Sequence, residues 1–162
     1  MHPVQAYLKQ LRDIRSTGGA VAEESYYGAL EAFLNDVGSK LKPKVRCVLQ
    51  LQNRGAGKPD AGLYTADQFQ RSKDREPMQG QPPERGAIEV KPTSDDAWLT
   101  ASGKQVSKYW GKYGQVLVTN YRDFVLVGQD ADRETAWVAP NAAIVYKIES
   151  CPRFSYAKMS EA

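Results

Sequence analysis

The residues GAIEVKPTSDD, at positions 86–96, constrain the fold of this chain more than any other stretch. Side chains alternate along a strand, so Glu89 and Lys91 share one side while Ile88 and Val90 take the other and require burial. The acid Glu89 and the base Lys91, on the side opposite to the two apolar residues, can be interpreted in two ways. One is a half-exposed strand whose polar side faces water, which these residues favour by themselves. The other is a metal ligand and a catalytic lysine facing a cleft.

The apolar patterns of the rest of the chain place this strand in an α/β domain. Apolar residues at helical spacing predict helices over about residues 1–15, 21–38 and 95–113. Short apolar or alternating runs predict strands over about residues 44–52, 60–64, 86–91, 115–120 and 123–128, and residues 143–148 fit a strand or a helix. This order fits a mixed central β-sheet flanked by helices.

Several residues predict where these elements end. The segment STGG should end the first helix near residues 16–19, and Gly38 should end the second. Ser94 or Thr93 is the expected cap of the third helix. Residues 65–85 are polar and rich in Gln, Pro and Arg, which predicts a long loop or insertion.

Length and composition predict one globular domain over residues 1–162. The chain is 41% hydrophobic and 25% charged, which excludes a disordered protein. No apolar run approaches the roughly 20 residues that span a membrane, and no apolar signal core is present, so we expect no membrane association. Two cysteines form neither a disulfide framework nor a zinc spacing; Cys47 suits a buried thiol and Cys151 an incidental one. A reducing cytoplasm is therefore the expected location.

The residue types and motifs that the sequence lacks limit the catalytic chemistry that it can support. The single histidine, His2, disfavours histidine-based triads, zinc sites and nucleases. The sequence holds no G-x-S-x-G, P-loop or G-x-G-x-x-G motif. Any hydrolytic chemistry must then rest on carboxylates, lysine and a hard metal ion. The net charge of +3 permits a nucleic-acid partner without requiring one.

Asp60 is the first acid that such chemistry needs. It follows Pro59 after a glycine-containing turn, where an aspartate also has an ordinary role as a turn residue. Adjacent antiparallel strands would bring Asp60 beside Glu89. Two neighbouring carboxylates repel each other, and a divalent cation removes the conflict. Mg²⁺ prefers a few carboxylates with water and phosphate oxygens, and Lys91 on the same side can stabilise charge at phosphorus.

The third predicted helix carries a second polar pattern. Gln105 and Tyr109, four residues apart, lie on one helix face. Tyr109 fits the core equally well, together with Val106 and Trp110, which would leave Gln105 on the surface. A lysine stripe runs beside the pair and suits either solvent or a DNA phosphate backbone. Its members are Lys104, Lys108 and Lys112.

In this order the motifs resemble those of the PD-(D/E)XK nuclease superfamily. The matching positions are Pro59–Asp60, Glu89–Lys91 and Gln105–Tyr109, the last being similar to the motif of RecB-like nucleases. The closer resemblance is to the N-terminal nuclease domain of single-chain restriction–modification enzymes of types IIG and ISP, which pair such a domain with an adenine methyltransferase. The likeness covers roughly residues 20–128. The interval between the first two motifs is longer than the family pattern because of the polar insertion.

The resemblance implies a restriction-endonuclease-like fold and a role for each matching residue. Asp60, Glu89 and the carbonyl of Val90 would be ligands of Mg²⁺, for which Mn²⁺ could substitute. Lys91 would orient or activate the attacking water. Gln105 and Tyr109 would orient that lysine, a metal-bound water or a DNA phosphate.

The resemblance also implies an acid from the early helix. Glu24 is the candidate, as a further catalytic residue and metal ligand, and Glu23 is the alternative. An ordinary helix N-terminal charge is the other interpretation of Glu24.

The resulting hypothesis is a Mg²⁺-dependent endodeoxyribonuclease that is the cleavage module of a restriction–modification system. The sequence lacks an N-P-P-Y motif and a glycine-rich cofactor strand, so a methyltransferase and target-recognition partner would lie outside these residues. A repair or recombination nuclease is the alternative, because the Gln-x-x-x-Tyr motif also occurs there. A DNA-binding module that no longer cuts is the rival from another class.

Overall fold

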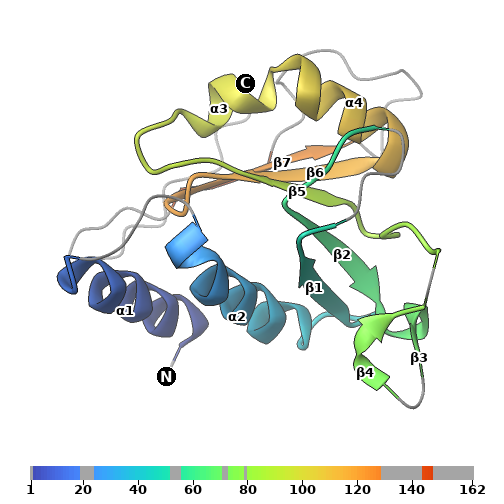
Figure 1. Ribbon diagram of the computed structural model, residues 1–162, viewed down its shortest axis with the longest axis horizontal. Helices are drawn as coiled ribbons and strands as arrows, with labels where there is room; N and C mark the ends of the chain where they lie inside the picture. The colour runs from blue at the N-terminus through green and yellow to red at the C-terminus, as the bar shows by residue number, and fades with distance from the viewer. Residues whose placement is uncertain are drawn as a thin grey trace.

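A six-stranded mixed sheet with helices on both faces forms the centre of the structure (Figure 1). The computed structural model describes residues 2–18, 24–51, 56–70, 73–78, 80–128 and 144–147. The helical elements are α1 (Pro3–Ser16), η1 (Glu24–Tyr26), α2 (Tyr27–Gly38), η2 (Ala66–Gln68), α3 (Ala97–Ala101) and α4 (Lys104–Tyr113). The strands are β1 (Val45–Leu49), β2 (Ala61–Thr65), β3 (Phe69–Gln70), β4 (Lys73–Pro77), β5 (Ala87–Val90), β6 (Gln115–Thr119), β7 (Asp123–Gly128) and β8 (Ile144–Lys147).

The expected mixed sheet is confirmed. Its strand order is β1-β2-β5-β6-β7-β8, in which β5 and β6 are parallel and the other neighbours are antiparallel. The two runs at 115–120 and 123–128 form an antiparallel hairpin, β6–β7. The ambiguous run at 143–148 contributes strand β8 beside β7. No helix of the described segments is long and apolar enough to cross a membrane.

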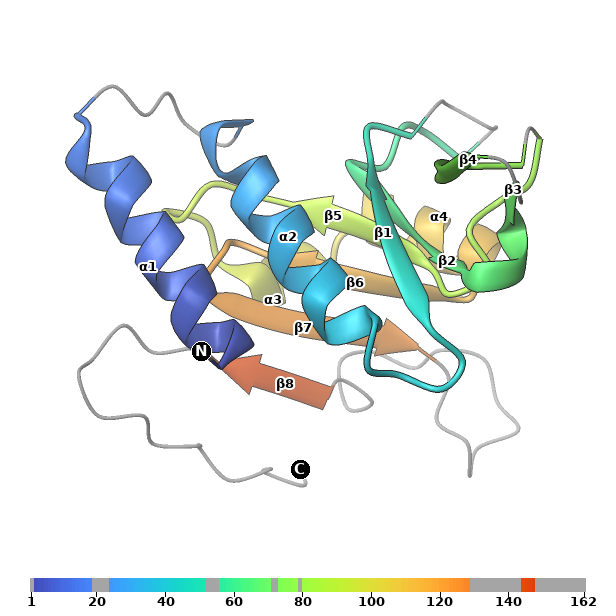
Figure 2. The same ribbon diagram turned by 90° about the horizontal axis from the view of Figure 1, so that it is seen from below.

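Helices α1 and α2 cover one face of the sheet, and α3 and α4 cover the other (Figures 1 and 2). The alternation of β5 explains this division. Ile88 and Val90 join the core under α1 and α2, whereas Ala87 joins the core under α3 and α4. All four residues of β5 are buried, because the strand lies in the middle of the sheet with helices on both sides.

The first helix follows its sequence pattern. Pro3 occupies the first turn, and the Val4 amide donates to the His2 ring nitrogen at 3.3 Å. The buried Tyr7 stacks on Phe33 of α2 with ring centroids 4.6 Å apart. Its hydroxyl donates to the carbonyl oxygen of Tyr121 at 2.9 Å, which fixes α1 to the β6–β7 turn.

The second helix ends at Gly38, as predicted, but for a different physical reason. The capping residue after it has ordinary right-handed backbone angles, so no left-handed glycine is needed there. A Cβ on Gly38 would instead collide with the carbonyl oxygen of Val45. Glycine therefore allows α2 to approach the edge of β1. The helix begins at Tyr27, after the single turn of η1, and residues 21–23 of the predicted range lie outside the described part of the chain.

The prediction of one helix over residues 95–113 is wrong. Two helices, α3 and α4, are separated at Ser102 and Gly103, and Gly103 is extended with φ −79° and ψ 156°. The predicted cap at Ser94 or Thr93 is also wrong. The carboxylate of Asp96 caps α3 by accepting from the amides of Trp98 at 2.7 Å and Leu99 at 3.2 Å.

The polar stretch at 65–85 is folded rather than a long loop. It contains η2 and the two-stranded sheet β3–β4. Gln68 organises it from a buried position: its side-chain oxygen accepts from the amides of Thr65 and Glu84, and its amide group donates to Pro82 at 2.7 Å. A glutamine that bonds residues 16 positions away leaves no periodic apolar signal, so sequence pattern alone did not reveal this structure.

Candidate active site

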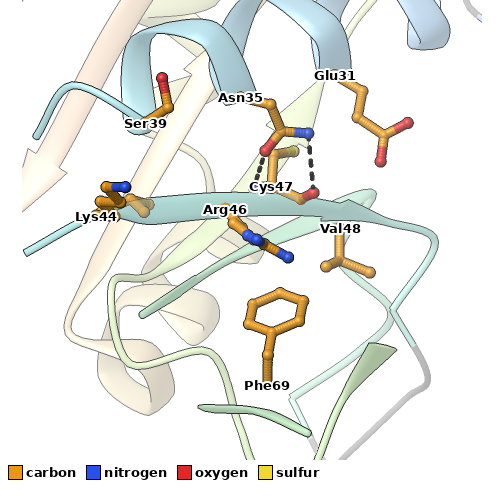
Figure 3. A pocket seen from close by; sticks show the side chains of 9 residues that line it. Glu31, Asn35, Ser39, Lys44, Arg46, Cys47, Val48 and Phe69 are labelled. Atoms are coloured by element: carbon orange, nitrogen blue, oxygen red, sulfur yellow. Dashed lines mark hydrogen bonds between the residues drawn. The ribbon is translucent and has the colours of Figure 1, made fainter. Parts of the chain in front are cut away.

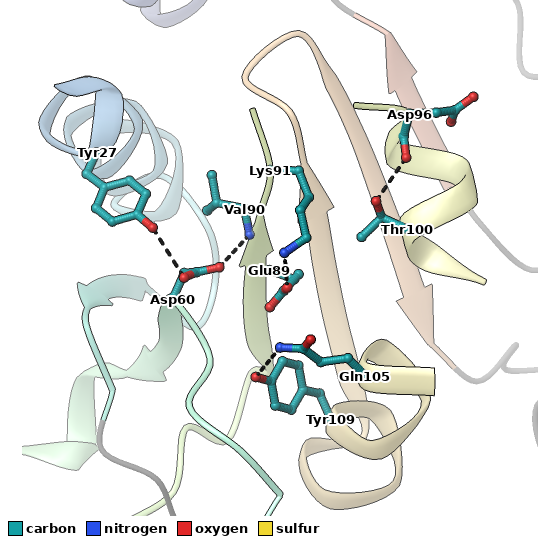
Figure 4. A network of polar contacts seen from close by, with 9 residues as sticks. All are labelled: Tyr27, Asp60, Glu89, Val90, Lys91, Asp96, Thr100, Gln105 and Tyr109. Carbon is teal, nitrogen blue, oxygen red and sulfur yellow. Dashed lines mark hydrogen bonds and ion pairs between the residues drawn. The ribbon is translucent and has the colours of Figure 1, made fainter. Parts of the chain in front are cut away.

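Strands β2 and β5 bring the predicted acids together. The two strands pair antiparallel, with Ala61 opposite Ile88. Just before β2, the Asp60 amide donates to the carbonyl oxygen of Ile88 at 3.1 Å. Asp60 therefore lies beside the segment that carries Glu89, which confirms the predicted neighbourhood of the two strands (Figure 4).

The carboxylate of Asp60 is held at both oxygens. Its Oδ2 accepts from the backbone amide of Val90 at 2.8 Å. Its Oδ1 accepts from the hydroxyl of Tyr27, the first residue of α2, at 3.2 Å. Sequence reasoning did not identify Tyr27 as a site residue, because a tyrosine at apolar helical spacing also fits a core position.

Glu89 and Lys91 form an ion pair on the α4 side of β5. Lys91 Nζ lies 2.6 Å from Glu89 Oε1, and the side chains are 32% and 3% exposed, respectively. The backbone amide of Lys91 donates to the Thr119 carbonyl at 2.8 Å, which ties this position to β6. A strand with its polar side in water is thus excluded, since a buried carboxylate next to a partly exposed lysine faces the inside of the site.

Gln105 and Tyr109 are in contact with each other and close to both acids. Gln105 Nε2 donates to the Tyr109 hydroxyl at 2.9 Å (Figure 4). Burial raises the pKa of Tyr109, and the nearby carboxylates of Glu89 and Asp60 raise it further. The two sequence interpretations of Tyr109 are therefore compatible: its ring lies in the core with Val106, and its hydroxyl reaches the site.

The loop before Asp60 also approaches Tyr109. Gly57 has φ +114°, and a Cβ placed on it would lie 3.2 Å from the Tyr109 hydroxyl oxygen. Only glycine combines this backbone angle with so close an approach at low cost. The glycine-containing turn before Asp60 therefore serves to bring the loop against α4.

The remaining predicted residues are exposed. Glu24 lies in η1 with its side chain in solvent, and Glu23 lies outside the described residues. In the described ranges no group of three or more His, Cys, Asp or Glu residues is arranged to hold a metal ion, so a metal-binding role for Glu24 stays a prediction. The lysines of the α4 stripe are all exposed, and their role on DNA also stays a prediction: Lys104, Lys108 and Lys112.

The donor set at β2 and β5 suits a hard divalent cation. A cation at this place would be held by carboxylate oxygens of Asp60 and Glu89 and by the carbonyl oxygen of Val90. Mg²⁺ is typically bound by one or two carboxylates together with waters and substrate phosphates, so a third protein acid is not needed. The residues present fit Mg²⁺ on this chemical ground.

A separate pocket of about 540 Å³ lies between α2 and β1 (Figure 3). Its wall includes Arg46, whose guanidinium lies 4.8 Å from the centre of the Phe69 ring, and Cys47. Burial raises the pKa of the Cys47 thiol to about 12, and the Glu31 carboxylate adds to the effect, so this thiol is no nucleophile at neutral pH. None of the predicted site residues lines this pocket, which separates it from the candidate site.

Comparison with known proteins supports the fold. No family model matches the sequence, and no curated protein matches it. Among solved structures, a chain in the cryo-EM structure of a DrdV–DNA complex is similar, with a TM-score of 0.55 and 22% sequence identity. The match covers 78% of this chain and 11% of that chain, so the similar region is a small part of a much longer protein. The restriction-endonuclease-like fold is confirmed at this level.

Proposed function

We propose that this chain is a Mg²⁺-dependent endodeoxyribonuclease module that hydrolyses DNA phosphodiester bonds. The observation that carries the proposal is the placement of Asp60, just before β2, beside strand β5, which carries Glu89, with Lys91 paired to Glu89. Mg²⁺ would be held by the two carboxylates and the carbonyl of Val90, and Mn²⁺ could replace it. When bound, the ion would supply positive charge to the phosphate and increase the acidity of a nearby water.

The protein's own groups would perform the remaining tasks. The partly exposed Lys91 ammonium would hold the attacking water or a phosphate oxygen through its donor hydrogens. Gln105 would share its amide between Tyr109 and the groups around Lys91. In the reaction the water oxygen forms a bond to phosphorus and gives up a proton to the surrounding solvent, the bond from phosphorus to the leaving oxygen breaks, and that oxygen takes up a proton from solvent.

DNA is the proposed substrate because of the charge around the site and the similar structure. The exposed lysines of α4 begin one residue before Gln105, on the helix that also carries Tyr109. Lysines in this position suit the phosphate backbone. The similar chain belongs to a complex with DNA and is much longer. Within this proposal the module cuts during restriction of foreign DNA, and a methyltransferase and target-recognition unit lies outside it.

The proposal is tested by cleavage of supercoiled plasmid, linear duplex and single-stranded DNA with Mg²⁺ or Mn²⁺. Wild type should cut in a metal-dependent manner, and Asp60→Asn should not. Asp67→Asn is the matched control, because it removes an exposed carboxylate on η2 at the other end of β2. Full activity of Asp60→Asn would refute the proposal.

The substrate preference separates the alternatives. Preference for ends or single strands would favour a repair or recombination nuclease. An absence of cleavage together with metal-independent DNA binding would favour the module that no longer cuts.

A further inference from the structure

The two hydrogen bonds on Asp60 come from two different parts of the fold. The Val90 amide belongs to the central strand β5, and the Tyr27 hydroxyl belongs to α2 on one face of the sheet. Figure 4 shows Asp60 between these two donors. The Tyr27 contact spans 33 residues of sequence and is a direct polar link from α2 to the candidate site.

The position of Tyr27 is fixed by the packing of its helix. The preceding residue, Tyr26, contacts the buried Tyr121 ring at a centroid distance of 5.3 Å. One turn later, Leu30 is fully buried in the core under α1 and α2. The Tyr27 ring itself is half-buried against the same core. The hydroxyl is therefore presented to Asp60 by a helix start that is packed on both sides of it.

The chemistry of a carboxylate explains what this contact does. An aspartate side chain rotates freely about its last torsion unless its oxygens are held. Each carboxylate oxygen has two acceptor positions, so one bond to Tyr27 and one to Val90 leave one position on each oxygen. A cation could use the remaining positions with the carboxylate already oriented.

We infer that Tyr27 is a positioning residue for the metal-binding carboxylate of Asp60, an inference that rests on the proposed function. Tyr27 acts through Asp60, and it requires contact with neither DNA nor the attacking water. Partners of this kind, one step removed from a metal, typically change metal affinity by about 10- to 100-fold when they are removed. The rate at saturating metal should change much less, since the acids and Lys91 remain.

The test is direct Mn²⁺ binding to the full chain without DNA, measured by electron paramagnetic resonance of the free ion and by calorimetry. Tyr27→Phe keeps the ring and removes the hydroxyl. It should weaken Mn²⁺ binding by about 10- to 100-fold. In parallel, the Mn²⁺ concentration that gives half-maximal cleavage should rise by the same factor, while the saturated rate stays within a few-fold of wild type.

Tyr26→Phe is the matched control, because it removes a hydroxyl from the adjacent tyrosine, whose ring packs on Tyr121. It should bind Mn²⁺ as wild type does. Circular dichroism and melting curves establish that each variant is folded. If Tyr27→Phe is unfolded, Tyr27→Met provides the same loss of the hydroxyl on an apolar side chain.

Failure of this inference is distinguishable from failure of the proposed function. Wild-type Mn²⁺ affinity in folded Tyr27→Phe, with binding lost in Asp60→Asn, would overturn the role of Tyr27 alone. Equal Mn²⁺ binding by wild type and Asp60→Asn would overturn the metal site and with it this inference.

Discussion

At the scale of single residues, the ion pair of the buried Glu89 and the partly exposed Lys91 is the central feature of the proposed site. The Lys91 nitrogen lies 2.6 Å from a carboxylate that is almost fully removed from water, while 32% of the lysine side chain remains exposed. The Lys91 side chain can therefore contact a substrate without a large rearrangement of the residues around it. Removal of the lysine also leaves the carboxylate buried without this partner, so some loss of stability should accompany the loss of charge.

We expect Lys91→Met to reduce single-turnover cleavage by a factor of about 10² or more, the usual scale for one electrostatic group in a transition state. Gln105→Ala should reduce it less, because Gln105 acts through Tyr109 and the lysine. Both rates are measured at saturating Mn²⁺. Lys9→Ala, an exposed lysine of α1, is the control and should cut as wild type does. A rate for Lys91→Met close to wild type would remove the lysine from the mechanism.

The sequence predicted those site residues that a strand or helix pattern can relate to one another. Asp60, Glu89 and Lys91 followed from strand alternation and the expected pairing of two strands, and Gln105 with Tyr109 followed from helical spacing. Tyr27 did not follow, because its partner is 33 residues away and its apolar ring already accounts for its place on the helix. The burial of Glu89 also required the structure, since a four-residue strand does not reveal how much of it is covered.

At the scale of elements, the free edge of β1 is closed by α2. The strand lies at the end of the sheet, where unpaired backbone groups could pair with another chain. Asn35 covers one such position, because its Oδ1 accepts from the Cys47 amide at 2.8 Å and its Nδ2 donates to the Cys47 carbonyl at 3.4 Å (Figure 3). The side-chain amide takes the place of a neighbouring strand.

We expect Asn35→Leu to destabilise the protein by about 1–3 kcal/mol for the backbone groups that it leaves unsatisfied. It should also increase self-association at the β1 edge. Asn35→Asp is the matched comparison, since it keeps the acceptor for the Cys47 amide and loses the donor, and it should lie between Asn35→Leu and wild type. Urea unfolding gives the stability, and light scattering gives the association. An unchanged unfolding midpoint in Asn35→Leu would contradict this role.

Element boundaries show where sequence patterns lose information. A helix pattern runs through residues 95–113, and one glycine inside it costs only about 1 kcal/mol, which a pattern does not register as a break. The structure breaks there because Gly103 is extended and begins a second helix. The five runs predicted as strands, in contrast, each overlap a strand of the six-stranded sheet, since their apolar side chains face the cores on its two faces.

At the scale of the whole molecule, three exposed lysines lie along one helix, α4, although the net charge is only +3. The exposed lysine stripe lies on α4, the helix that also reaches the candidate site through Gln105 and Tyr109. A DNA duplex bound along the stripe could therefore also contact the site. This arrangement explains how a mildly basic chain could bind a strongly charged polymer.

We expect the triple change Lys104→Ala, Lys108→Ala and Lys112→Ala to weaken DNA binding at all sequences. The slope of log affinity against log salt should fall by about 1 for each lysine that contacts a phosphate. Binding is measured by fluorescence anisotropy at several salt concentrations, with Ca²⁺ in place of Mg²⁺. The triple change Lys9→Ala, Lys40→Ala and Lys42→Ala removes equal charge elsewhere. An identical slope for the two triple variants would contradict a specific role for the stripe.

The hydrogen bond from Val90 to Asp60 has a consequence for the sheet itself. Up to Asp60 the β2–β5 ladder is built from backbone groups, and its next rung is a side-chain carboxylate. The Asp60 carboxylate, which makes the last hydrogen bond at this end of the ladder, is thus the same group that the proposed chemistry would use. Any event that rotates the Asp60 carboxylate away from Val90 would break this hydrogen bond between the two segments. The pairing of β2 with β5 would then be one hydrogen bond shorter, so its length depends on the conformation of the site.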